Sequence, residues 1–417
     1  MTQSAAKPGV LVLASTYPRW VGDPEPGFVH ELCKRLTAQF HVTVVCPHAK
    51  GAPERETMEG VHVVRYRYAP DALETLVNDG GIVTNLKRAK WKWFLVPPFV
   101  LMQAWAAWRV TRKVNIDVVH AHWLIPQGMI AAAIARLSRR SMRYLVTSHG
   151  ADLYALNGRL LKVMKRAVIR QSAGVTVVSS AMVKQAASIG ADTQKIAVIP
   201  MGVDLADRFC IDESVQRSRN EILFVGRLVE KKGVRYLLEA LSLVKEQIPD
   251  VCLTIAGFGP DEAALKAQVR ALGLDSSVRF TGAIPQTDLP PMYRRAALFV
   301  APFVQAASGD QEGLPVALME AVACGCPVVA GDIAGIDDLL GELKSEVCVD
   351  AVDVRALAAK ICQELAQPEN ARRRAEQVRA HAADLVDWRH VAARYTGLLD
   401  AARSDQNRLQ EKHGEAT

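Results

Sequence analysis

Short valine-rich runs that alternate with amphipathic helical stretches restrict the fold of this chain more than any other feature. Apolar runs of this kind, bounded by turn residues, are typical of strands buried in a parallel sheet whose faces are covered by helices. The pattern occurs twice, on either side of a polar segment, residues 202–220, that lacks periodicity. We therefore predict an α/β fold made of two doubly wound domains.

The predicted strands can be read directly from the sequence. In the first half they are Val10–Ala14, Val42–Cys46, Val61–Tyr66, Asp117–His120, Arg143–Ser148 and Gly174–Ser179. In the second half they are Glu221–Val225, Val251–Ala256, Val278–Thr281, Leu298–Ala301 and Pro327–Ala330. A first strand, a loop rich in proline and glycine and a helix from Phe28 are the usual opening of a Rossmann-like unit. We place the domain limits at 1–202 and 203–386, with a final helical segment at 387–417.

Charge is distributed unevenly over the 417 residues. The net charge is +7, but residues 1–200 hold 26 Lys and Arg against 12 Asp and Glu, so the first half is strongly basic. A basic half favours contact with phosphates, anionic lipid or nucleic acid. The 8 cysteines show no CxxC spacing, which favours reduced thiols in a cytoplasmic protein over a metal site. The apolar run at Val10–Ala14 is too short for the core of a signal peptide.

Residues 308–329 contain two glutamates, Glu312 and Glu320, around an expected helix. Pro315 suits the first helical position, and Gly325 suits the end of the helix. At about 1.5 Å per residue the two acids would lie ~12 Å apart along the axis, which fits the two ends of an extended ligand better than a shared metal. The helix N-terminus between them offers N–H groups to an anion. Taken alone, the pattern also fits a surface helix with two solvated glutamates.

Residues 87–109 depart from the alternation and hold four of the 7 tryptophans among lysines and arginines. The segment is too short and too interrupted by proline for a convincing membrane span, which needs ~20 apolar residues. Aromatic and basic residues together fit a surface that lies on anionic headgroups, or a lid over a lipid-linked substrate. Residues 159–170 are also amphipathic and basic, with lysines and arginines interleaved with aliphatic residues. A buried core helix with a solvated basic rim explains residues 87–109 equally well.

Three motifs in the second half, Phe224–Gly233, Ile255–Pro260 and Glu312–Glu320, occur in an order and spacing that resemble the retaining family 4 glycosyltransferases of GT-B fold. The resemblance covers nearly the whole chain. It implies two Rossmann-like domains that face a cleft, an acceptor-side domain followed by a nucleotide-sugar-binding domain. It also implies that the C-terminal helix, in 387–417, returns to the first domain.

The resemblance assigns roles to four charged residues. Glu312 matches the carboxylate that contacts the sugar hydroxyls, and Glu320 matches the one that contacts the nucleotide ribose. Arg227 and Lys232 match the basic pair on the donor diphosphate. Cleavage of the anomeric C–O bond leaves negative charge on that diphosphate, and fixed cations stabilise the charge where it develops. We therefore expect no metal ion and no cofactor besides a donor of UDP or GDP type.

Further donor contacts follow from the same resemblance. Gly257 and Gly259 would let the backbone turn tightly beside the nucleotide, and Arg279 would lie at the base pocket. Gly27 matches the position at which the first loop meets the phosphates, although the usual paired glycines are replaced here by Gly22 and Pro26-Gly27.

The segment after the first glutamate departs from the family pattern. The commoner sequence is Glu-Gly-Phe-Gly, whereas this chain has Glu312-Gly-Leu-Pro315. Proline has no N–H, so Gly313 and Leu314 would supply the phosphate-binding amides. This form resembles a subgroup associated with bacterial exopolysaccharide and lipopolysaccharide assembly.

On the acceptor side, His122 ends one predicted strand region and matches a functional histidine of related enzymes. His149 and Asp152 follow another strand and are further candidates. A histidine there can orient a hydroxyl or share a proton, or it can be a structural residue at the sheet edge. The resemblance implies a front-face reaction in which the departing phosphate accepts the acceptor proton, so no covalent nucleophile is required.

We therefore expect a hexosyltransferase of cell-surface polysaccharide synthesis that works at the inner face of the cell membrane. Its partners would be a nucleotide-sugar donor, a glycan or lipid-linked acceptor and an anionic membrane surface, with no nucleic acid. Two alternatives are a nucleotide-sugar epimerase on the same architecture and a basic protein that binds anionic membrane or nucleic acid. An epimerase would convert the donor without any acceptor, so product analysis on the donor alone distinguishes it from a transferase. A binding protein would keep its salt-sensitive binding after loss of Glu312 and Glu320.

Overall fold

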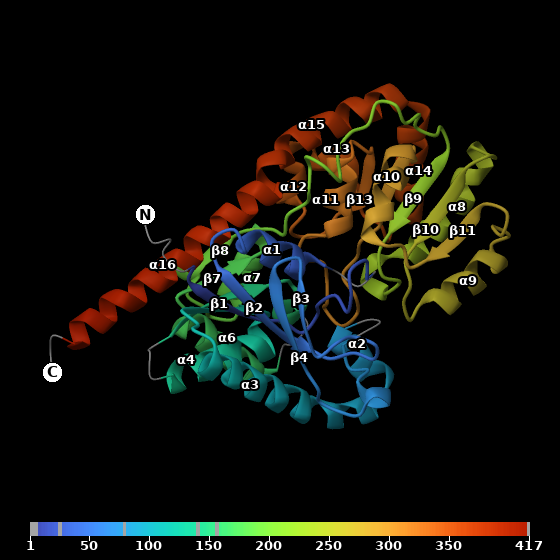
Figure 1. Ribbon diagram of the computed structural model, residues 1–417. Coiled ribbons are helices and arrows are strands. Elements are labelled where there is room, and N and C mark those ends of the chain that lie inside the picture. The colour runs from blue at the N-terminus through green and yellow to red at the C-terminus, as the bar shows by residue number, and fades with distance from the viewer. Residues whose placement is uncertain (1–6, 24–26, 78–80, 139–141, 155–157, 415–417) are drawn as a thin grey trace. The chain divides into compact units, whose positions relative to one another are not determined.

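The computed structural model describes residues 7–23, 27–77, 81–138, 142–154 and 158–414 (Figure 1). The contacts between its residues divide the chain into two compact units. Unit 1 comprises the chain up to Val178, Met182–Ile199 and the segment from Val391 onward. Unit 2 comprises Ser179–Ala181 and Pro200–His390. The family's mixed α/β architecture, with one largely parallel sheet in each unit, is confirmed.

Unit 1 is built on an 8-stranded sheet, counted over its described residues, in the order β3-β4-β2-β1-β5-β6-β7-β8. The strands are β1 (Gly9–Leu13), β2 (His41–Pro47), β3 (Arg55–Met58), β4 (Val61–Tyr66), β5 (Val118–His122), β6 (Arg143–Ser148), β7 (Gly174–Val177) and β8 (Ile196–Val198). All neighbours pair in parallel except β3 and β4. Val12 lies between Val44 and His120 in this register. The sequence prediction missed β3, which is polar, and β8, which is short.

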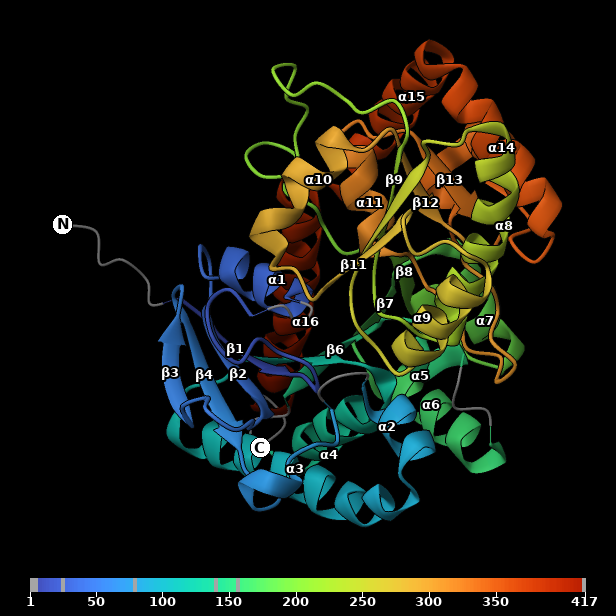
Figure 2. The same cartoon turned by 90° about the vertical axis from the view of Figure 1, so that its right-hand side faces the viewer.

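Helices cover both faces of the unit 1 sheet. They are α1 (Phe28–Leu36), α2 (Gly81–Arg88), α3 (Val96–Lys113), α4 (Met129–Leu137), α5 (Ala151–Tyr154), α6 (Arg159–Gln171), α7 (Ser180–Ser188) and α16 (Trp388–Gly414). In Figures 1 and 2, α3, α4 and α6 lie on one side of the sheet, and α1 and α16 lie on the other. The helix predicted from Phe28 ends at Leu36, and the next turn leads directly into β2.

A buried glutamine ties α3 to the carboxyl ends of two strands. The Gln103 amide donates to the carbonyl oxygens of Ala14 (3.0 Å) and Val45 (3.4 Å), and its oxygen accepts a hydrogen bond from Gln127 (3.0 Å). Buried amides without partners are costly, so a fully bonded Gln103 specifies how α3 docks on the sheet. The loops that follow β1 and β2 are held in place in this way.

Unit 2 contains a 6-stranded parallel sheet, counted over its described residues, in the order β11-β10-β9-β12-β13-β14. The strands are β9 (Glu221–Val225), β10 (Cys252–Ala256), β11 (Val278–Gly282), β12 (Leu298–Ala301), β13 (Val328–Gly331) and β14 (Cys348–Val349). The first five match predicted strands, whereas β14 has only two residues and gives no detectable pattern.

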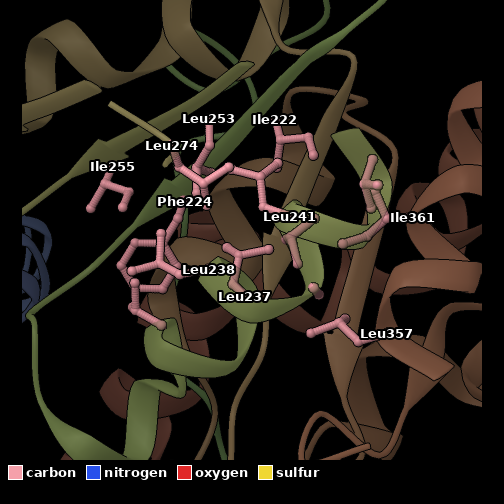
Figure 3. Close-up of a cluster of buried hydrophobic side chains, with 14 of the residues drawn as sticks. Ile222, Phe224, Leu237, Leu238, Leu241, Leu253, Ile255, Leu274, Leu357 and Ile361 are labelled. Carbon is pink, nitrogen blue, oxygen red and sulfur yellow. The ribbon is translucent and has the colours of Figure 1, made fainter. Parts of the chain in front are cut away.

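Helices also cover both faces of this second sheet. They are α8 (Val234–Gln247), α9 (Glu262–Ala271), α10 (Leu289–Arg295), α11 (Val316–Ala323), α12 (Asp337–Leu340), α13 (Lys344–Val347), α14 (Val354–Ala366) and α15 (Pro368–Val386). Figure 3 shows how one face is closed: strand residues such as Phe224 and Leu253 gather against Leu241 of α8 and Leu357 of α14. Each of these side chains is at most 1% exposed. Full burial of such a side chain stabilises the fold by about 1.5–3 kcal/mol.

In both sheets the strand order reverses at one point, between β1 and β5 in unit 1 and between β9 and β12 in unit 2. At such a point the loops after neighbouring strands diverge to opposite faces, and ligands of doubly wound sheets bind in the crevice left between them. The sequence motifs of the second half follow β9, β10 and β12. The C-terminal helix returns to unit 1 as expected, because Tyr395 of α16 is buried there beside Thr147 and Thr176.

Candidate active site

The loops after β9, β10 and β12 touch through their backbones, and glycines make the contacts possible. Gly233 has φ +65°, and a Cβ there would lie 1.8 Å from the carbonyl oxygen of Pro302. A Cβ on Gly257, at φ +150°, would lie 1.9 Å from the oxygen of Gly226, and one on Gly259 would lie 2.3 Å from that of Leu228. Only glycine fits at these three positions. The predicted glycines therefore shape one continuous loop cluster at the switch point of unit 2.

Four charged residues meet in this cluster. The Glu312 carboxylate lies 3.2 Å from Nζ of Lys231 through Oε1 and 3.4 Å from Nζ of Lys232 through Oε2. Lys231 also lies 3.3 Å from the Asp310 carboxylate. Both lysines belong to a short 3-10 turn, Glu230–Lys232, that leads into α8 through Gly233. The structure thus joins the predicted Lys232 and Glu312, and adds Lys231 and Asp310.

The cluster carries more positive charge than Glu312 alone compensates. Burial opposes ionisation of Glu312, but Lys231 and Lys232, with a smaller effect from Arg227, outweigh it and hold its pKa at about 2. Burial lowers the pKa of Lys232, and the neighbouring Lys231 and Arg227 lower it further against the effect of Glu312. A cation whose charged form is disfavoured by its neighbours is stabilised by an incoming anion. The site is therefore electrostatically prepared for a phosphate.

Glu320 lies inside α11 in a different environment. It is 3% exposed and accepts hydrogen bonds from the side-chain amide of Gln286 (2.7 Å) and the hydroxyl of Tyr293 (3.0 Å). Arg208 donates to the side-chain oxygen of Gln286 (3.3 Å). Burial raises the pKa of Glu320 to about 7, although the bonds from Gln286 and Tyr293 oppose the rise. The two glutamates therefore differ sharply: one is fixed as an anion by lysines, and the other is held by neutral donors.

The start of α11 corrects one detail of the sequence prediction. Pro315 is the N-cap, with φ −73° and ψ 121°, and the helix begins at Val316. Glu312 therefore lies on the preceding loop, and the ~12 Å helical spacing does not apply to this pair. The N–H groups of Gly313 and Leu314 donate to no backbone carbonyl in the described part of the chain. The helix ends as predicted, with Gly325 in the left-handed region at φ +65°.

Arg279 does not join this cluster. It is an exposed residue of β11 and reaches the Thr254 hydroxyl at 3.4 Å; that hydroxyl donates to Glu221 at the start of β9. Gly282, at the end of the same strand, lies at the loop cluster instead, where its carbonyl oxygen accepts the N–H of Gly257 (2.8 Å).

In unit 1, the candidate histidines form a buried group at the carboxyl ends of β5 and β6. Nδ1 of His122 and Nε2 of His149 are 2.9 Å apart, and the His122 ring lies 4.3 Å from that of His120. His120 in turn bonds the hydroxyl of Thr147 (2.8 Å). Burial lowers the pKa of both His120 and His149 to about 3 and that of His122 well below the usual range. The rings are therefore neutral at physiological pH, so they serve as hydrogen-bonding groups and not as cations.

Asp152 and Gly27 lie near the histidines. The buried Asp152 carboxylate accepts the N–H of Leu124 (2.6 Å) and the hydroxyl of Ser148 (2.8 Å), which fixes the loop after β5. Burial raises the pKa of Asp152 against these bonds. Gly27 is the N-cap of α1 and precedes Phe28, whose ring lies 4.8 Å from His149. The structure thus gathers all four unit 1 candidates at one end of the sheet.

Residues 87–109 fit neither alternative alone, because α3 buries one face while the four tryptophans of the segment are exposed. Trp93 is 60% exposed and Phe94 82%, and Trp105 and Trp108 of α3 are also exposed, with their rings stacked at 5.1 Å. The buried face of α3 consists of Phe99, Gln103, Ala107 and Val110. Within the described residues, no helix combines the length and apolar character that a membrane crossing requires.

One group of potential metal ligands occurs among the described residues, away from these motifs. His48, Asp71 and Glu74 bring their ligand atoms within 4.8 Å of one another. Each already has a partner: His48 and Glu74 bond one another, and Asp71 pairs with Arg67. The group is explained as a hydrogen-bonded pair, His48 and Glu74, beside the ion pair of Asp71 and Arg67.

Sequence reasoning missed four residues around the two glutamates. Lys231 and Asp310 surround Glu312, and Gln286 and Tyr293 hold Glu320. The doublet Lys231-Lys232 was visible as a motif, but nothing in the sequence indicated which lysine faces which acid. Gln286 and Tyr293 lie outside the three sequence motifs, and the fold brings them to Glu320.

Two doubly wound sheets and a basic, carboxylate-bearing loop cluster at a switch point define a GT-B glycosyltransferase. Family models confirm this class: "Glycosyltransferase Family 4" matches residues 28–207, and "Glycosyl transferases group 1" matches residues 211–381. The chain belongs to glycosyltransferase family 4 and is a nucleotide-sugar-dependent enzyme.

Individual relatives agree with this assignment. The chain is 30% identical over 407 residues to the GDP-mannose-dependent alpha-(1-6)-phosphatidylinositol monomannoside mannosyltransferase of Mycolicibacterium smegmatis, across 94% of this chain and 99% of that protein. It is 32% identical over 236 residues to the amylovoran biosynthesis glycosyltransferase AmsK of Erwinia amylovora, across 56% and 57% of the two chains. The sucrose-phosphate synthase of Thermosynechococcus elongatus has the same fold, with a TM-score of 0.75 at 19% identity over 99% of this chain and 100% of that chain.

Proposed function

We propose that the protein transfers a hexose-like sugar, with retention of anomeric configuration, from a nucleoside diphosphate to a glycan or lipid-linked acceptor of the cell surface. The observation that carries the proposal is the joint placement of Arg227, Lys232 and Glu312 at the switch point of the unit 2 sheet. Cations grouped around the fixed Glu312 carboxylate fit a diphosphate that is bonded to a polyhydroxylated sugar.

The role of each charged group follows from its environment. Arg227 and Lys232 would stabilise the negative charge that develops on the departing diphosphate. Glu312 is ionised, and an ionised carboxylate only accepts hydrogen bonds, so it suits sugar hydroxyl groups. Glu320 would accept hydrogen bonds from the ribose hydroxyls. Under this proposal side-chain cations compensate the diphosphate charge, and excess EDTA should leave the transfer rate unchanged.

Retention is proposed to proceed on one face of the sugar. The departing phosphate would accept the proton of the acceptor hydroxyl as the new glycosidic bond forms and the bond to the diphosphate breaks. Neutral His122 and His149 suit the orientation of a hydroxyl group better than the compensation of charge. Nuclear magnetic resonance of the product tests the proposal, because an inverted anomeric carbon would contradict it.

The donor is best identified by ligand-dependent stability. The Mycolicibacterium smegmatis relative is GDP-mannose dependent and aligns over nearly its full length, so GDP and GDP-mannose are the first ligands to test, with UDP and ADP beside them. A ligand at about 100 times its Kd adds about 2.7 kcal/mol to the free energy of unfolding. A rise in melting temperature with one nucleotide names the base. No rise with any of them would contradict the donor-site assignment.

We further propose that an exposed surface of unit 1 binds anionic membrane. This α3 surface comprises the exposed Trp91, Trp93, Phe94, Trp105 and Trp108 together with Lys87, Arg88, Lys90, Arg109, Arg112 and Lys113. No Asp or Glu occurs between positions 81 and 113. Aromatic rings that partition into the interface and basic side chains that are attracted to acidic headgroups are the two components of peripheral membrane binding. This would place the enzyme at the anionic, cytoplasmic face of the membrane.

Vesicle sedimentation tests the membrane proposal. Vesicles with 30% phosphatidylglycerol should bind the protein, and binding should weaken as salt screens the basic residues, with about 1 kcal/mol contributed by each basic side chain at the surface. The double variant Trp93→Glu/Phe94→Glu should lose binding. Trp20→Glu, which changes an exposed tryptophan outside the α3 surface, is the matched control. Equal binding of both variants, or equal binding to uncharged vesicles, would contradict the proposal.

A further inference from the structure

Lys231 has no hydrogen-bonding capacity left for a ligand. Its ammonium group lies 3.2 Å from Oε1 of Glu312, 3.3 Å from Oδ2 of Asp310 and 3.4 Å from the carbonyl oxygen of Gln311. An ammonium group has three N–H donors, and three separate acceptors surround this one. The side chain is only 12% exposed. Lys231 is therefore fully engaged within the protein.

The other two cations of the cluster have donors to spare. Nζ of Lys232 has one carboxylate partner, Glu312 at 3.4 Å, and otherwise lies over the ring of Phe303 at 4.9 Å. Within the described part of the chain, no side-chain hydrogen bond or ion pair is formed by the half-buried guanidinium of Arg227. Free N–H groups for a diphosphate thus exist on Arg227 and Lys232 and are absent from Lys231.

The titration of the two lysines supports the same division. Burial would lower the pKa of Lys231, but the carboxylates of Glu312 and Asp310 outweigh it and raise the pKa. For Lys232, burial and the adjacent cations prevail over Glu312 and lower the pKa. Carboxylates of the protein therefore compensate the charge of Lys231, whereas the charge of Lys232 is only partly compensated and would be stabilised by a bound anion.

The turn that carries Lys231 also holds the loop that carries Glu312. The carbonyl oxygen of Lys231 accepts the N–H of Val304 (3.0 Å), and the Glu230 carboxylate accepts the N–H of Ala307 (2.9 Å). Together with the contacts of the Lys231 side chain, these bonds fix the loop at its beginning, its middle and its end. The position of the Glu312 carboxylate therefore depends on Lys231.

We infer that Lys231 is a positioning residue, anchored by Asp310, that aims the Glu312 carboxylate at the donor sugar while Arg227 and Lys232 bind the diphosphate. The inference rests on the proposed function and assigns different roles to the two adjacent lysines. Without Lys231, Glu312 keeps only Lys232 as a partner, and the Asp310 carboxylate is left facing Glu312 with no cation between them. Recognition of the sugar should fail, whereas recognition of the nucleoside diphosphate should persist.

Calorimetric titration and donor turnover test this division in the full-length enzyme. The ligands are GDP and GDP-mannose, or UDP and UDP-glucose if the melting experiment selects uracil, and turnover is measured as donor hydrolysis. For Lys231→Met we expect the Kd for the nucleoside diphosphate to stay within about threefold of wild type while kcat falls at least about tenfold, the loss of one well-placed contact. Lys232→Met should instead raise that Kd at least about tenfold, because it removes a cation from the phosphate. Lys231→Arg should recover part of the lost kcat.

The outcomes separate this inference from the proposed function. Equal weakening of nucleoside diphosphate binding in Lys231→Met and Lys232→Met, or an unchanged kcat in Lys231→Met, would overturn the role of Lys231 while the donor site stands. No nucleoside diphosphate binding by the wild-type enzyme would overturn the proposed function itself. If circular dichroism shows that Lys231→Met does not fold, the same measurements on Asp310→Asn test the role of Lys231. Loss of kcat with preserved nucleotide affinity supports the inference, and an unchanged kcat overturns it.

Discussion

The buried carboxylate of Glu320 predicts that nucleotide binding depends on pH. Gln286 and Tyr293 donate hydrogen bonds to this carboxylate, and the positive charge of Arg208 also lowers its pKa. Burial outweighs these effects and raises the pKa to about 7. Ribose hydroxyls donate hydrogen bonds most strongly to an ionised carboxylate, so the nucleotide should bind the form without a proton. The perturbation that isolates this effect is Glu320→Gln, which keeps the shape and removes the titration.

The size of the change in nucleotide affinity with pH follows from the pKa of Glu320. With a pKa of about 7 in the free enzyme, Glu320 is about 90% protonated at pH 6 and almost fully ionised at pH 8.5. The sign is fixed by the raised value: affinity is highest above pH 7 and falls as the pH drops below it. Because only the ionised fraction binds, the apparent Kd should rise about tenfold between pH 8.5 and pH 6, or about 1.4 kcal/mol. Binding at pH 6 should release about 0.9 protons from Glu320 for each nucleotide bound.

Calorimetric titration in two buffers of different ionisation enthalpy measures both quantities. The terminal phosphate of the nucleotide also titrates near neutral pH, so the contribution of Glu320 is the difference between wild type and Glu320→Gln at each pH. We expect a difference of about 0.9 protons at pH 6 that vanishes by pH 8.5. If wild type and Glu320→Gln release the same number of protons and show the same pH profile of affinity, the assignment of Glu320 to the ribose is refuted.

Two further predictions concern stability. Gly233→Ala should cost more in the free energy of unfolding than Gly273→Ala: both glycines have φ near +65°, which costs about 1–2 kcal/mol for alanine, but only at Gly233 would the Cβ collide with a carbonyl oxygen. Equal losses in urea denaturation would contradict the backbone contact between the loops. Tyr395→Phe removes a hydroxyl bonded to Thr147 (3.4 Å) and Thr176 (3.2 Å) and should destabilise unit 1 by about 1 kcal/mol in the same assay. No change would show that these bonds do not fasten α16.

The strands of the two sheets were predictable because buried parallel strands are short apolar runs that can be recognised in the sequence. Val-rich runs such as Glu221–Val225 and Arg143–Ser148 coincide with the observed β9 and β6. The missed strands lack this apolar pattern. β3 is a polar edge strand that pairs on one side only, and β14 is two residues long, so neither buries enough apolar surface to leave a periodic pattern.

The geometry of the proposed donor site was predictable where motif residues lie on the loops of one switch point. Lys232 and Glu312 meet there, and the glycines of both motifs allow the loops to touch. The division between Lys231 and Lys232 was not predictable, because adjacent residues in a 3-10 turn point in directions that only the neighbouring loop fixes. The family resemblance placed Arg279 at the base pocket, but in the structure its side chain lies beside Thr254, whereas Gly282 reaches the loop cluster.

The central claim is that Arg227, Lys232 and Glu312 form the donor site for glycosyl transfer. The most direct test is the rate at which labelled sugar passes from the selected nucleotide donor into an acceptor fraction extracted from membranes, measured for wild type and Lys232→Ala. The account predicts that Lys232→Ala keeps the wild-type circular dichroism spectrum and loses about 10²–10³-fold in rate, as expected when a group that stabilises developing charge is removed. Transfer by Lys232→Ala at the wild-type rate would contradict it.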